Sequence, residues 1–484
     1  MPTTWAFQSA TELAEALRER QMSSTELLEY FLARADRYND DVNAIAVFDR
    51  ERARQRAKEA DEAFERGENW GPLHGLPMTI KESYDVAGLP STHGVPAMKD
   101  NVPQVDALSV SRLKKAGAVI FGKTNVPMRL ADFQSYNEIY GTTKNPYDLE
   151  RTPGGSSGGS AAALAAGMTG FETGSDIGGS IRNPAHFCGI FGHKPTWNLL
   201  PPRGHAPPGI LTPSDISVIG PMGRSAADLR IGVDAMAGPN EIEGRGFQLA
   251  LRSSSKPISE WKVAVWANDS VSPVGVAVQE RIHKVAKTLE SLGATIDDAA
   301  RPAFSSEQAS ATYQSLLQPV MSGRLPDKEF NELVAEAEGL DPNDRSERAM
   351  VRRRQTARHR DWLRVNEVRT HLRWAWHRFF EEWDLVLAPV MPTSAFPHDQ
   401  RAFGKRSLDV DGDARPYFEQ VFWSGLTGVA LLPSTVIPTG LDEAGLPIGL
   451  QIIGPEYGDL DCLDAAELLE DEGYRFVPPE GYDD

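Results

Sequence analysis

Apolar and polar positions near the N-terminus alternate with the period of helices that pack one face on a core. Ser23 and Glu26 have the spacing of a capping box, and the apolar residues after them recur at helical spacing. We therefore predict an amphipathic helix over 24–38. A short buried strand over 44–48 and a charged helix over 50–66, ended by a glycine, are predicted to follow it.

Short apolar strands alternate with helices and glycine-rich turns over 73–204. Strands are predicted at 77–80 and 118–121, and the same alternation resumes later with a strand at 261–266 and a helix near 276–292. Alternation of this kind predicts βα units built around a sheet.

The most basic part of the chain is 345–380, which holds eleven arginines between Arg345 and Arg378. Its apolar residues lie near helical spacing, so we predict a long surface helix with one buried stripe and keep an RNA-contacting face as the alternative. Beyond it, apolar runs at 384–390 and 445–453 predict buried strands that return to the first core. The pattern as a whole predicts a single large α/β domain whose mixed sheet is covered on both faces by helices.

The charge balance and the cysteine count narrow the class of protein. The 484 residues include 50 Lys and Arg against 68 Asp and Glu, a net charge of −18, which repels phosphate backbones, so a dedicated nucleic-acid binder is not expected. Two cysteines, Cys188 and Cys462, are too few for a disulfide scaffold and fit a reducing compartment. Because the chain has no secretory leader and no run of roughly 18 apolar residues, we expect a cytoplasmic protein that does not enter a membrane.

A glycine- and serine-rich run, Gly154–Ser160, leads directly into the alanine-rich segment Ala161–Gly167. A flexible linker should not continue straight into a helix, whereas a loop before a helix N-terminus presents backbone N–H groups and the positive end of the helix dipole. A phosphate-binding loop is a second interpretation, but neither glycine-rich phosphate motif matches here. We therefore interpret the run as part of a binding or catalytic site.

A second loop, Gly174–Arg182, contains an Ile-Gly-Gly-Ser run. Its successive amides can point at one spot and hold an anion or a developing oxyanion, so its serine, Ser180, is a candidate nucleophile. A serine needs a base, and His186 and His193 are the nearest histidines in sequence. Ser180 does not lie in a G-x-S-x-G elbow, which disfavours a Ser-His-Asp hydrolase without excluding it, and the His186–Cys188–His193 spacing matches no zinc pattern.

Lys81 offers a different base. It follows the apolar run 76–80, where a partly buried ammonium has a lowered pKa, and a neutral lysine can accept a proton. A lysine at the end of a strand is most often a surface residue, so residue type alone does not assign this role.

Together these motifs resemble the amidase signature family of serine hydrolases. The segments that carry the resemblance are 75–81, 122–125, 152–160, 176–182 and 192–196. The match is specific over 73–204, and weaker similarity at 385–392 and 428–455 covers most of the remainder.

The resemblance implies one amidase domain over 1–484, with its signature core at about 73–204. It places a variable helical insertion at about 300–380, and strands over 384–455 that return to the core.

Carried over position by position, the resemblance makes Ser180 the nucleophile that forms an acyl-enzyme, Ser156 the bridging serine whose preceding peptide is cis in the family, and Lys81 the ultimate base. Ser156 would pass the Ser180 proton to neutral Lys81 and then return a proton to the leaving amine. No histidine, metal or organic cofactor is then required. The oxyanion hole would be formed by four backbone amides, those of Ile177, Gly178, Gly179 and Ser180.

Other positions bear on support and on substrate. Asp176 and Arg182 would brace the nucleophile loop, and Leu130 matches the position that lines the acyl pocket in relatives of fatty-acid amide hydrolase. Glu82 stands where many members have Asp, which leaves the base in place. The stretch Met128–Gln134 looks more like the stand-alone amidases than like the tRNA-linked amidotransferase member of the family.

We therefore expect an amidase that hydrolyses the C–N bond of a small-molecule carboxamide, anilide or carbamate. Its expected partner is that amide substrate, with no nucleic acid, no membrane and a homodimer as its possible assembly. The alternative is the amidase component, or A subunit, of a glutamyl-tRNA(Gln)-type amidotransferase, which generates ammonia from glutamine and acts through partner subunits.

Overall fold

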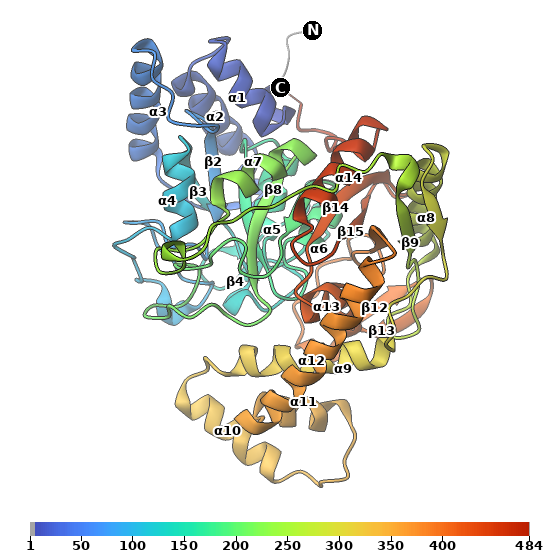
Figure 1. Cartoon of the computed structure of the whole chain (residues 1–484). Coiled ribbons are helices and arrows are strands. Elements are labelled where there is room, and N and C mark those ends of the chain that lie inside the picture. The colour runs from blue at the N-terminus through green and yellow to red at the C-terminus, as the bar shows by residue number, and fades with distance from the viewer. Residues whose placement is uncertain (1–4, 484) are drawn as a thin grey trace.

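The main element of the fold is a mixed sheet of eight strands, seen in a computed structural model that describes residues 5–483 (Figure 1). The order is β10–β9–β11–β15–β14–β7–β8–β6, with β10–β9 and β9–β11 parallel and the other neighbours antiparallel. In that order the strands are Thr295–Asp297, Lys262–Val265, Leu385–Pro389, Pro447–Ile453, Ser434–Leu441, Phe191–Lys194, Val218–Gly223 and Glu172–Asp176.

The α-helices of the described residues lie around this sheet, beside a smaller sheet and in a projecting segment. They are α1 (Ala10–Arg18), α2 (Ser24–Val42), α3 (Arg50–Glu65), α4 (Leu108–Lys115), α5 (Gly158–Ala165), α6 (Arg182–Phe187), α7 (Ala226–Met236), α8 (Val276–Ser291), α9 (Ser306–Ser322), α10 (Asp327–Glu338), α11 (Glu347–Gln355), α12 (His359–Phe380), α13 (Val421–Val429) and α14 (Asp459–Asp471). Two short hairpins, β4–β5 and β12–β13, are formed by Tyr136–Asn137 with Gly141–Thr142 and by Ser407–Val410 with Asp413–Pro416.

Both faces of the main sheet are covered by helices. On β7, the ring of His193 lies 3.1 Å from the Asp459 carboxylate of α14, whereas a Cβ at the preceding Gly192 would lie 3.0 Å from Ala185 of α6. Successive residues of a strand point to opposite faces, so α14 and α6 lie on opposite sides of the sheet. Double coverage explains why β15 is apolar and buried at every position. The predicted fold class is confirmed.

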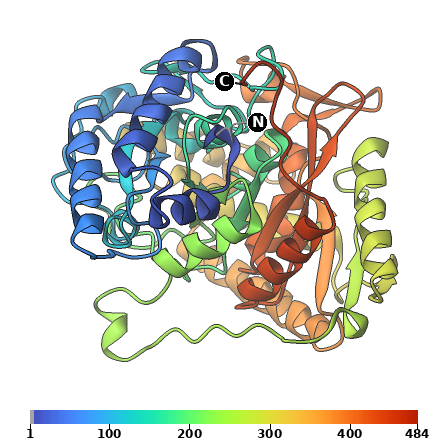
Figure 2. The ribbon, with the colours of Figure 1, turned by 90° about the horizontal axis from the view of Figure 1, so that it is seen from above.

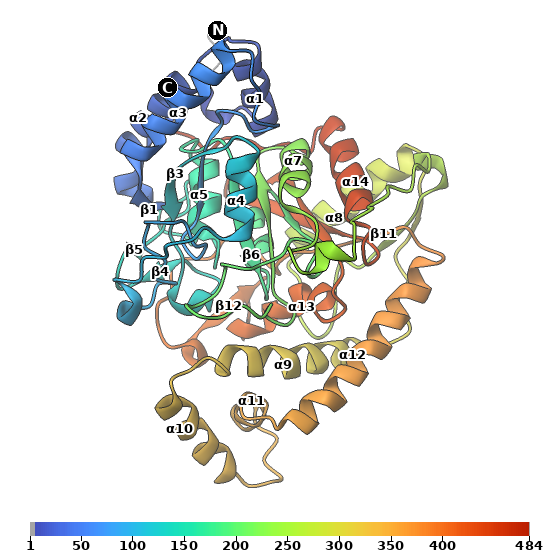
Figure 3. The same ribbon diagram turned by 60° about the vertical axis from the view of Figure 1, so that its left-hand side comes forward.

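Three further strands form a small sheet of their own beside α2 and α3 (Figure 3). β3 (Val119–Thr124) pairs antiparallel with β1 (Ile45–Phe48) and parallel with β2 (Pro77–Lys81). The sequence predicted all three strands but not their separation from the main sheet. The separation follows from packing: Phe31 of α2 lies with Met78 of β2 in a buried cluster distinct from that of the main sheet. Figure 2 shows this N-terminal half on one side and the C-terminal strands on the other.

The N-terminal helices form as their caps predict. The Ser23 hydroxyl accepts the Glu26 N–H and the Glu26 carboxylate accepts the Ser23 N–H, the capping box that starts α2. The helix continues past the predicted end at 38 and stops at Val42, because Asn43 adopts a left-handed conformation with φ 53°.

The predicted insertion contains α9 to α12, and α10 and α11 project from the body (Figure 1). The long helix predicted over 345–380 is wrong as a single element: α11 ends at Gln355, and α12 begins after Arg358, whose backbone is extended with φ −71° and ψ 150°. The predicted buried stripe is present on α12, where Leu372, Trp376 and Phe379 are buried.

Over residues 5–483, no helix has the length and apolar character needed to cross a membrane. Cys188 and Cys462 are both buried and form no disulfide.

Candidate active site

Lys81, the last residue of β2, is completely buried and surrounded by serine hydroxyls. Its Nζ lies 2.7 Å from the Oγ of Ser156, 2.8 Å from that of Ser157 and 2.9 Å from that of Ser175. Burial lowers the pKa of Lys81 from 10.5 to about 7, although the carboxylates of Asp176 and Glu172 oppose the change. The predicted lowering of the pKa is therefore present, and burial is its main cause.

Ser156 lies in a tightly packed loop, and the residue before it has no space for a side chain. The Gly155–Ser156 peptide is cis, and the Asn183 side chain holds it by accepting the Gly155 N–H at 3.0 Å and donating to the Gly155 carbonyl. A Cβ at Gly155 would lie 2.5 Å from the Asp132 carbonyl oxygen. Close approach of neighbouring backbone thus explains the glycine before Ser156.

Ser180 lies between β6 and α6, with 7% of its surface exposed. Its backbone carbonyl accepts the N–H of Ser157 at 3.1 Å, which places the two serine-containing loops side by side. The structure therefore brings the predicted nucleophile loop, the bridging serine and the lysine into one buried site.

Asp176 and Arg182 brace the nucleophile loop as predicted. Their side chains form a completely buried ion pair at 2.8 Å, and the Asp176 carboxylate also accepts the N–H groups of Gly179 at 2.9 Å and Ile181 at 3.2 Å. Burial alone would raise the pKa of Asp176, but the Arg182 charge and its hydrogen bonds outweigh burial and lower the pKa to about 2. The carboxylate therefore stays charged and holds the loop closed.

Arg182 also ties this loop to the main sheet and to α13. Its guanidinium donates to the Thr427 hydroxyl at 2.7 Å and to the Gln451 side-chain oxygen of β15 at 3.0 Å. The loop is thus held by two elements that lie more than 200 residues later in the chain.

The four predicted oxyanion amides differ in their partners. The Gly179 N–H is donated to Asp176, and a Cβ at Gly179, where φ is 106°, would lie 2.3 Å from the Ser424 hydroxyl. Within the described residues, the N–H groups of Ile177, Gly178 and Ser180 have no protein acceptor. The Tyr313 hydroxyl of α9 donates to the Ile177 carbonyl at 2.6 Å and so fixes the peptide that carries the Gly178 N–H.

Neither neighbouring histidine is available to Ser180. The two ring nitrogens of His186 lie 2.9 and 3.0 Å from the carbonyls of Gly449 and Thr393. Those of His193 lie 2.8 and 3.1 Å from the Thr435 hydroxyl and the Asp459 carboxylate. The arrangement does not support a Ser-His-Asp triad, and no group of three or more His, Cys, Asp or Glu that could hold a metal occurs over 5–483.

The sequence did not single out four residues that the site contains. Ser157 adjoins Ser156, and Ser175 precedes Asp176 on β6, so both were inside recognised motifs without a stated role. Asn183 follows Arg182 directly, whereas Tyr313 lies in the insertion, where no motif signalled it.

Leu130 is half-buried in a short 3-10 turn, Met128–Leu130, with a positive φ of 58°. Its backbone N–H donates to the Pro127 carbonyl at 3.0 Å, and the neighbouring Arg129 pairs with Glu329 of α10 at 3.2 Å. Its role in an acyl pocket stays a prediction.

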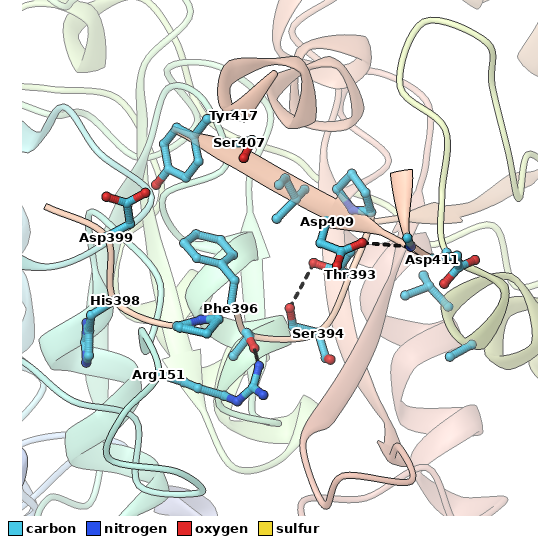
Figure 4. Close-up of a pocket in the computed structure, with 18 of the residues that line it drawn as sticks. Arg151, Thr393, Ser394, Phe396, His398, Asp399, Ser407, Asp409, Asp411 and Tyr417 are labelled. Atoms are coloured by element: carbon cyan, nitrogen blue, oxygen red, sulfur yellow. Dashed lines mark hydrogen bonds between the residues drawn. The ribbon is translucent and has the colours of Figure 1, made fainter. Parts of the chain in front are cut away.

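A cavity of about 1000 Å³ lies elsewhere, between the loop 392–401 and the β12–β13 hairpin (Figure 4). Arg151, Asp399 and Tyr417 are among its lining residues, and Lys81, Ser156 and Ser180 are not. The three catalytic candidates therefore lie outside this cavity.

Comparison with known protein families shows which family the chain belongs to. The family model Amidase matches residues 26–463. The chain belongs to the amidase family. This amidase resembles the A subunit of the glutamyl-tRNA(Gln) amidotransferase of Moorella thermoacetica, with 32% identity over 484 residues and 96% of each chain covered.

Solved structures extend the comparison. A bacterial aryl acylamidase of the amidase signature family matches this amidase with a TM-score of 0.81 and 25% identity, covering 97% of this chain and 96% of that one. The 6-aminohexanoate cyclic dimer hydrolase matches with a TM-score of 0.78 and 26% identity, covering 99% of both chains. The predicted family is therefore confirmed.

Proposed function

We propose that this amidase cleaves the C–N bond of an amide through an acyl-enzyme on Ser180, with Ser156 and Lys81 as the proton relay. The observation that carries the proposal is the completely buried Lys81 amine 2.7 Å from the Ser156 hydroxyl, with its pKa lowered to about 7 by burial. A neutral amine in that position is a base at physiological pH.

The surroundings of Lys81 define the direction of proton transfer. The Ser157 hydroxyl lies 3.4 Å from the Ser175 carbonyl, to which it donates, so its oxygen can accept an N–H of Lys81. With two N–H bonds directed at Ser157 and Ser175, the lone pair of neutral Lys81 faces Ser156. Ser156 then gives its proton to Lys81 as it takes the proton of Ser180.

Attack and collapse follow from this relay. The Ser180 oxygen bonds to the amide carbon, and the carbonyl oxygen becomes an oxyanion that the free N–H groups of Ile177, Gly178 and Ser180 stabilise. The Gly179 N–H does not take part, because it donates to the Asp176 carboxylate, and Gly179 serves only to form the turn. Lys81 returns its proton through Ser156 to the amide nitrogen, the C–N bond breaks and the amine leaves. Water then attacks the acyl carbon by the same relay and releases the acid.

Two substrate classes fit this chemistry. Hydrolysis of a small-molecule amide is supported by the Met128–Gln134 stretch and by the likeness to the aryl acylamidase. Ammonia release from glutamine is supported more strongly by sequence, since the Moorella relative at 32% identity belongs to an amidotransferase. In the second class the chain would act beside partner subunits and tRNA. This conflicts with our expectation, based on the net charge of −18, that the chain has no nucleic-acid partner.

A substrate panel separates the two classes. The purified chain is given a primary aliphatic amide, an acyl anilide, an aryl carbamate and glutamine, with Ser180→Ala as blank. Turnover of any of the first three, abolished in the blank, establishes hydrolysis by the isolated chain. Slow turnover of glutamine alone favours the amidotransferase role, and no turnover with no reaction of Ser180 with a fluorophosphonate contradicts the proposal.

A further inference from the structure

Arg324 lies in the turn between α9 and α10. Among the described residues its guanidinium makes neither an ion pair nor a hydrogen bond, whereas Arg348 and Arg352 pair with Glu336, and Arg129 pairs with Glu329. The side chain is exposed, and an arginine remains charged in proteins. Its guanidinium is therefore accessible to an anion that the protein itself does not supply.

His93 lies beside His205 and has a hydrogen-bonding group without a partner. Its side chain is 5% exposed, and its buried Nε2 has no hydrogen-bond partner among residues 5–483. Its pKa is lowered to about 4, mainly by burial and further by the charges of Lys123, Lys81 and Arg324, so the ring is neutral at pH 7. The nearby Glu82 carboxylate does not fill the gap, because its oxygens accept the N–H groups of Thr92 and His93.

His205 connects this group to the catalytic lysine. Its Nε2 lies 2.8 Å from the hydroxyl of Ser83, two residues beyond Lys81, and its ring centroid is 6.4 Å from that of His93. Together with Arg324 it lines a cavity of about 20 Å³, room for a water molecule or one carboxylate oxygen. Burial is the main cause that lowers the pKa of His205, and the charge of Arg324 adds to it, so the His205 ring is neutral beside a charged guanidinium.

We propose that Arg324, with His93 and His205 beside it, binds a carboxylate that the amide substrate carries away from its scissile bond. This inference rests on the proposed amide cleavage and adds the substrate class. Arg324 supplies the charge, and the neutral rings supply hydrogen bonds. A guanidinium binds a carboxylate through two parallel N–H bonds, which a neutral group of the same size cannot replace.

The test compares two matched pairs of amides that differ in a carboxylate. Glutarate monoanilide and hexananilide differ on the acyl side, and para-acetamidobenzoate and para-nitroacetanilide differ on the amine side. Release of the aromatic amine gives kcat and KM for the wild type, Arg324→Gln, Arg324→Lys and a control, Arg345→Gln. Arg345 is an exposed arginine of the same insertion that does not line this cavity.

Loss of the ion pair is expected to raise KM of Arg324→Gln for one of the two carboxylate substrates about ten- to hundredfold, with kcat and the neutral partner unchanged. Arg324→Lys should recover part of the loss, and Arg345→Gln should behave as wild type. The substrate pair whose charged member shows the raised KM tells whether the carboxylate lies on the acyl side or on the amine side of the amide. An equal effect of Arg324→Gln on charged and neutral substrates, or none on either, overturns the inference while leaving amide cleavage intact.

A readout without turnover separates the two proposals. The carboxylate compounds should protect Ser180 from a fluorophosphonate better than their neutral partners do in the wild type, and equally poorly in Arg324→Gln. Labelling of Ser180 without such a difference contradicts the carboxylate site. No labelling of Ser180 at all contradicts the proposed function itself.

Discussion

At the scale of single residues, the charge of Lys81 controls the chemistry. The pKa is lowered from 10.5 to about 7, so the amine is neutral above that pH and protonated below it. We predict that kcat/KM rises about tenfold per pH unit below pH 7 and levels off above it, since only the neutral amine is a base. A pH profile from 5.5 to 9 under conditions where chemistry limits the rate measures this.

Lys194 provides the control for that profile. It is also completely buried, and burial lowers its pKa to about 7, but its Nζ donates to the carbonyls of Pro195 and Leu432 instead of to serines. Lys194→Met should keep the inflection, and Lys81→Met should lose activity at every pH. A flat wild-type profile, or an inflection that disappears with Lys194, would remove Lys81 from the relay.

The buried Arg182–Asp176 pair is predicted to dominate the stability of the nucleophile loop. Arg182→Met leaves the Asp176 carboxylate buried without its counter-ion, which costs about 3–5 kcal/mol of unfolding free energy. The matched change Arg373→Met breaks a pair with Glu456 that is partly exposed and should cost about 0–1 kcal/mol. Urea denaturation compares the two variants, and equal losses would show that burial of the pair does not matter.

Several residues of the site could be predicted from the sequence because they lie in short, contiguous motifs. Lys81, Ser156, Asp176 and Arg182 lie in such motifs, and the structure brings them into one site, while the catalytic roles of Lys81 and Ser156 stay predictions. Ser157 and Ser175 were not given their contacts with Lys81, because the direction of a hydroxyl depends on how two loops meet across the end of β2.

At the scale of elements, α9 reaches from the insertion to the nucleophile loop. The Tyr313 hydroxyl holds the Ile177 carbonyl at 2.6 Å, and the same peptide carries the Gly178 N–H. Tyr313→Phe should lower kcat about tenfold with little change in KM, because one neutral hydrogen bond that orients an oxyanion donor is lost. Steady-state kinetics measure the effect, with the amide of the substrate panel that the wild type hydrolyses.

A second tyrosine gives the matched control. The Tyr38 hydroxyl of α2 donates to the Asp483 carbonyl near the C-terminus, far along the chain from the serines. Tyr38→Phe should leave kcat unchanged. A normal kcat in Tyr313→Phe would mean that the insertion does not orient the oxyanion site.

Elements with strong local signals were predicted well, and those that depend on long-range packing were not. The capping box at Ser23 and the apolar runs fixed α2, β1 and β2 to within a few residues. The break at 356–358 has no proline or glycine to announce it, and the separate three-stranded sheet depends on which core α2 and α3 cover.

At the scale of the whole molecule, burial is uneven. β15 is buried at every position and lies in the middle of the main sheet, whereas α10 has no buried residue and projects from the body. We predict that amides of α10 exchange with deuterium first and those of β15 last, since local opening costs least where few contacts are broken. Hydrogen exchange followed by mass spectrometry measures the order, and equal protection of both segments would contradict it.

The overall architecture followed from alternating strands and helices together with the motif resemblance. The strand order did not, because β11 and β14 pair with strands more than 100 residues earlier in the chain, as in β11–β9 and β14–β7. Pairing over such distances is set by the packed core, which no local pattern reports.

The most direct test of the serine–lysine relay is the site and rate of covalent labelling. The full chain is treated with a fluorophosphonate, digested and mapped by mass spectrometry, alongside Ser156→Ala and Lys81→Met. We predict a single adduct on Ser180 that forms faster as pH rises through about 7 and is strongly slowed in both variants. An adduct on another residue, or wild-type labelling of Ser180 without Lys81, would contradict the relay.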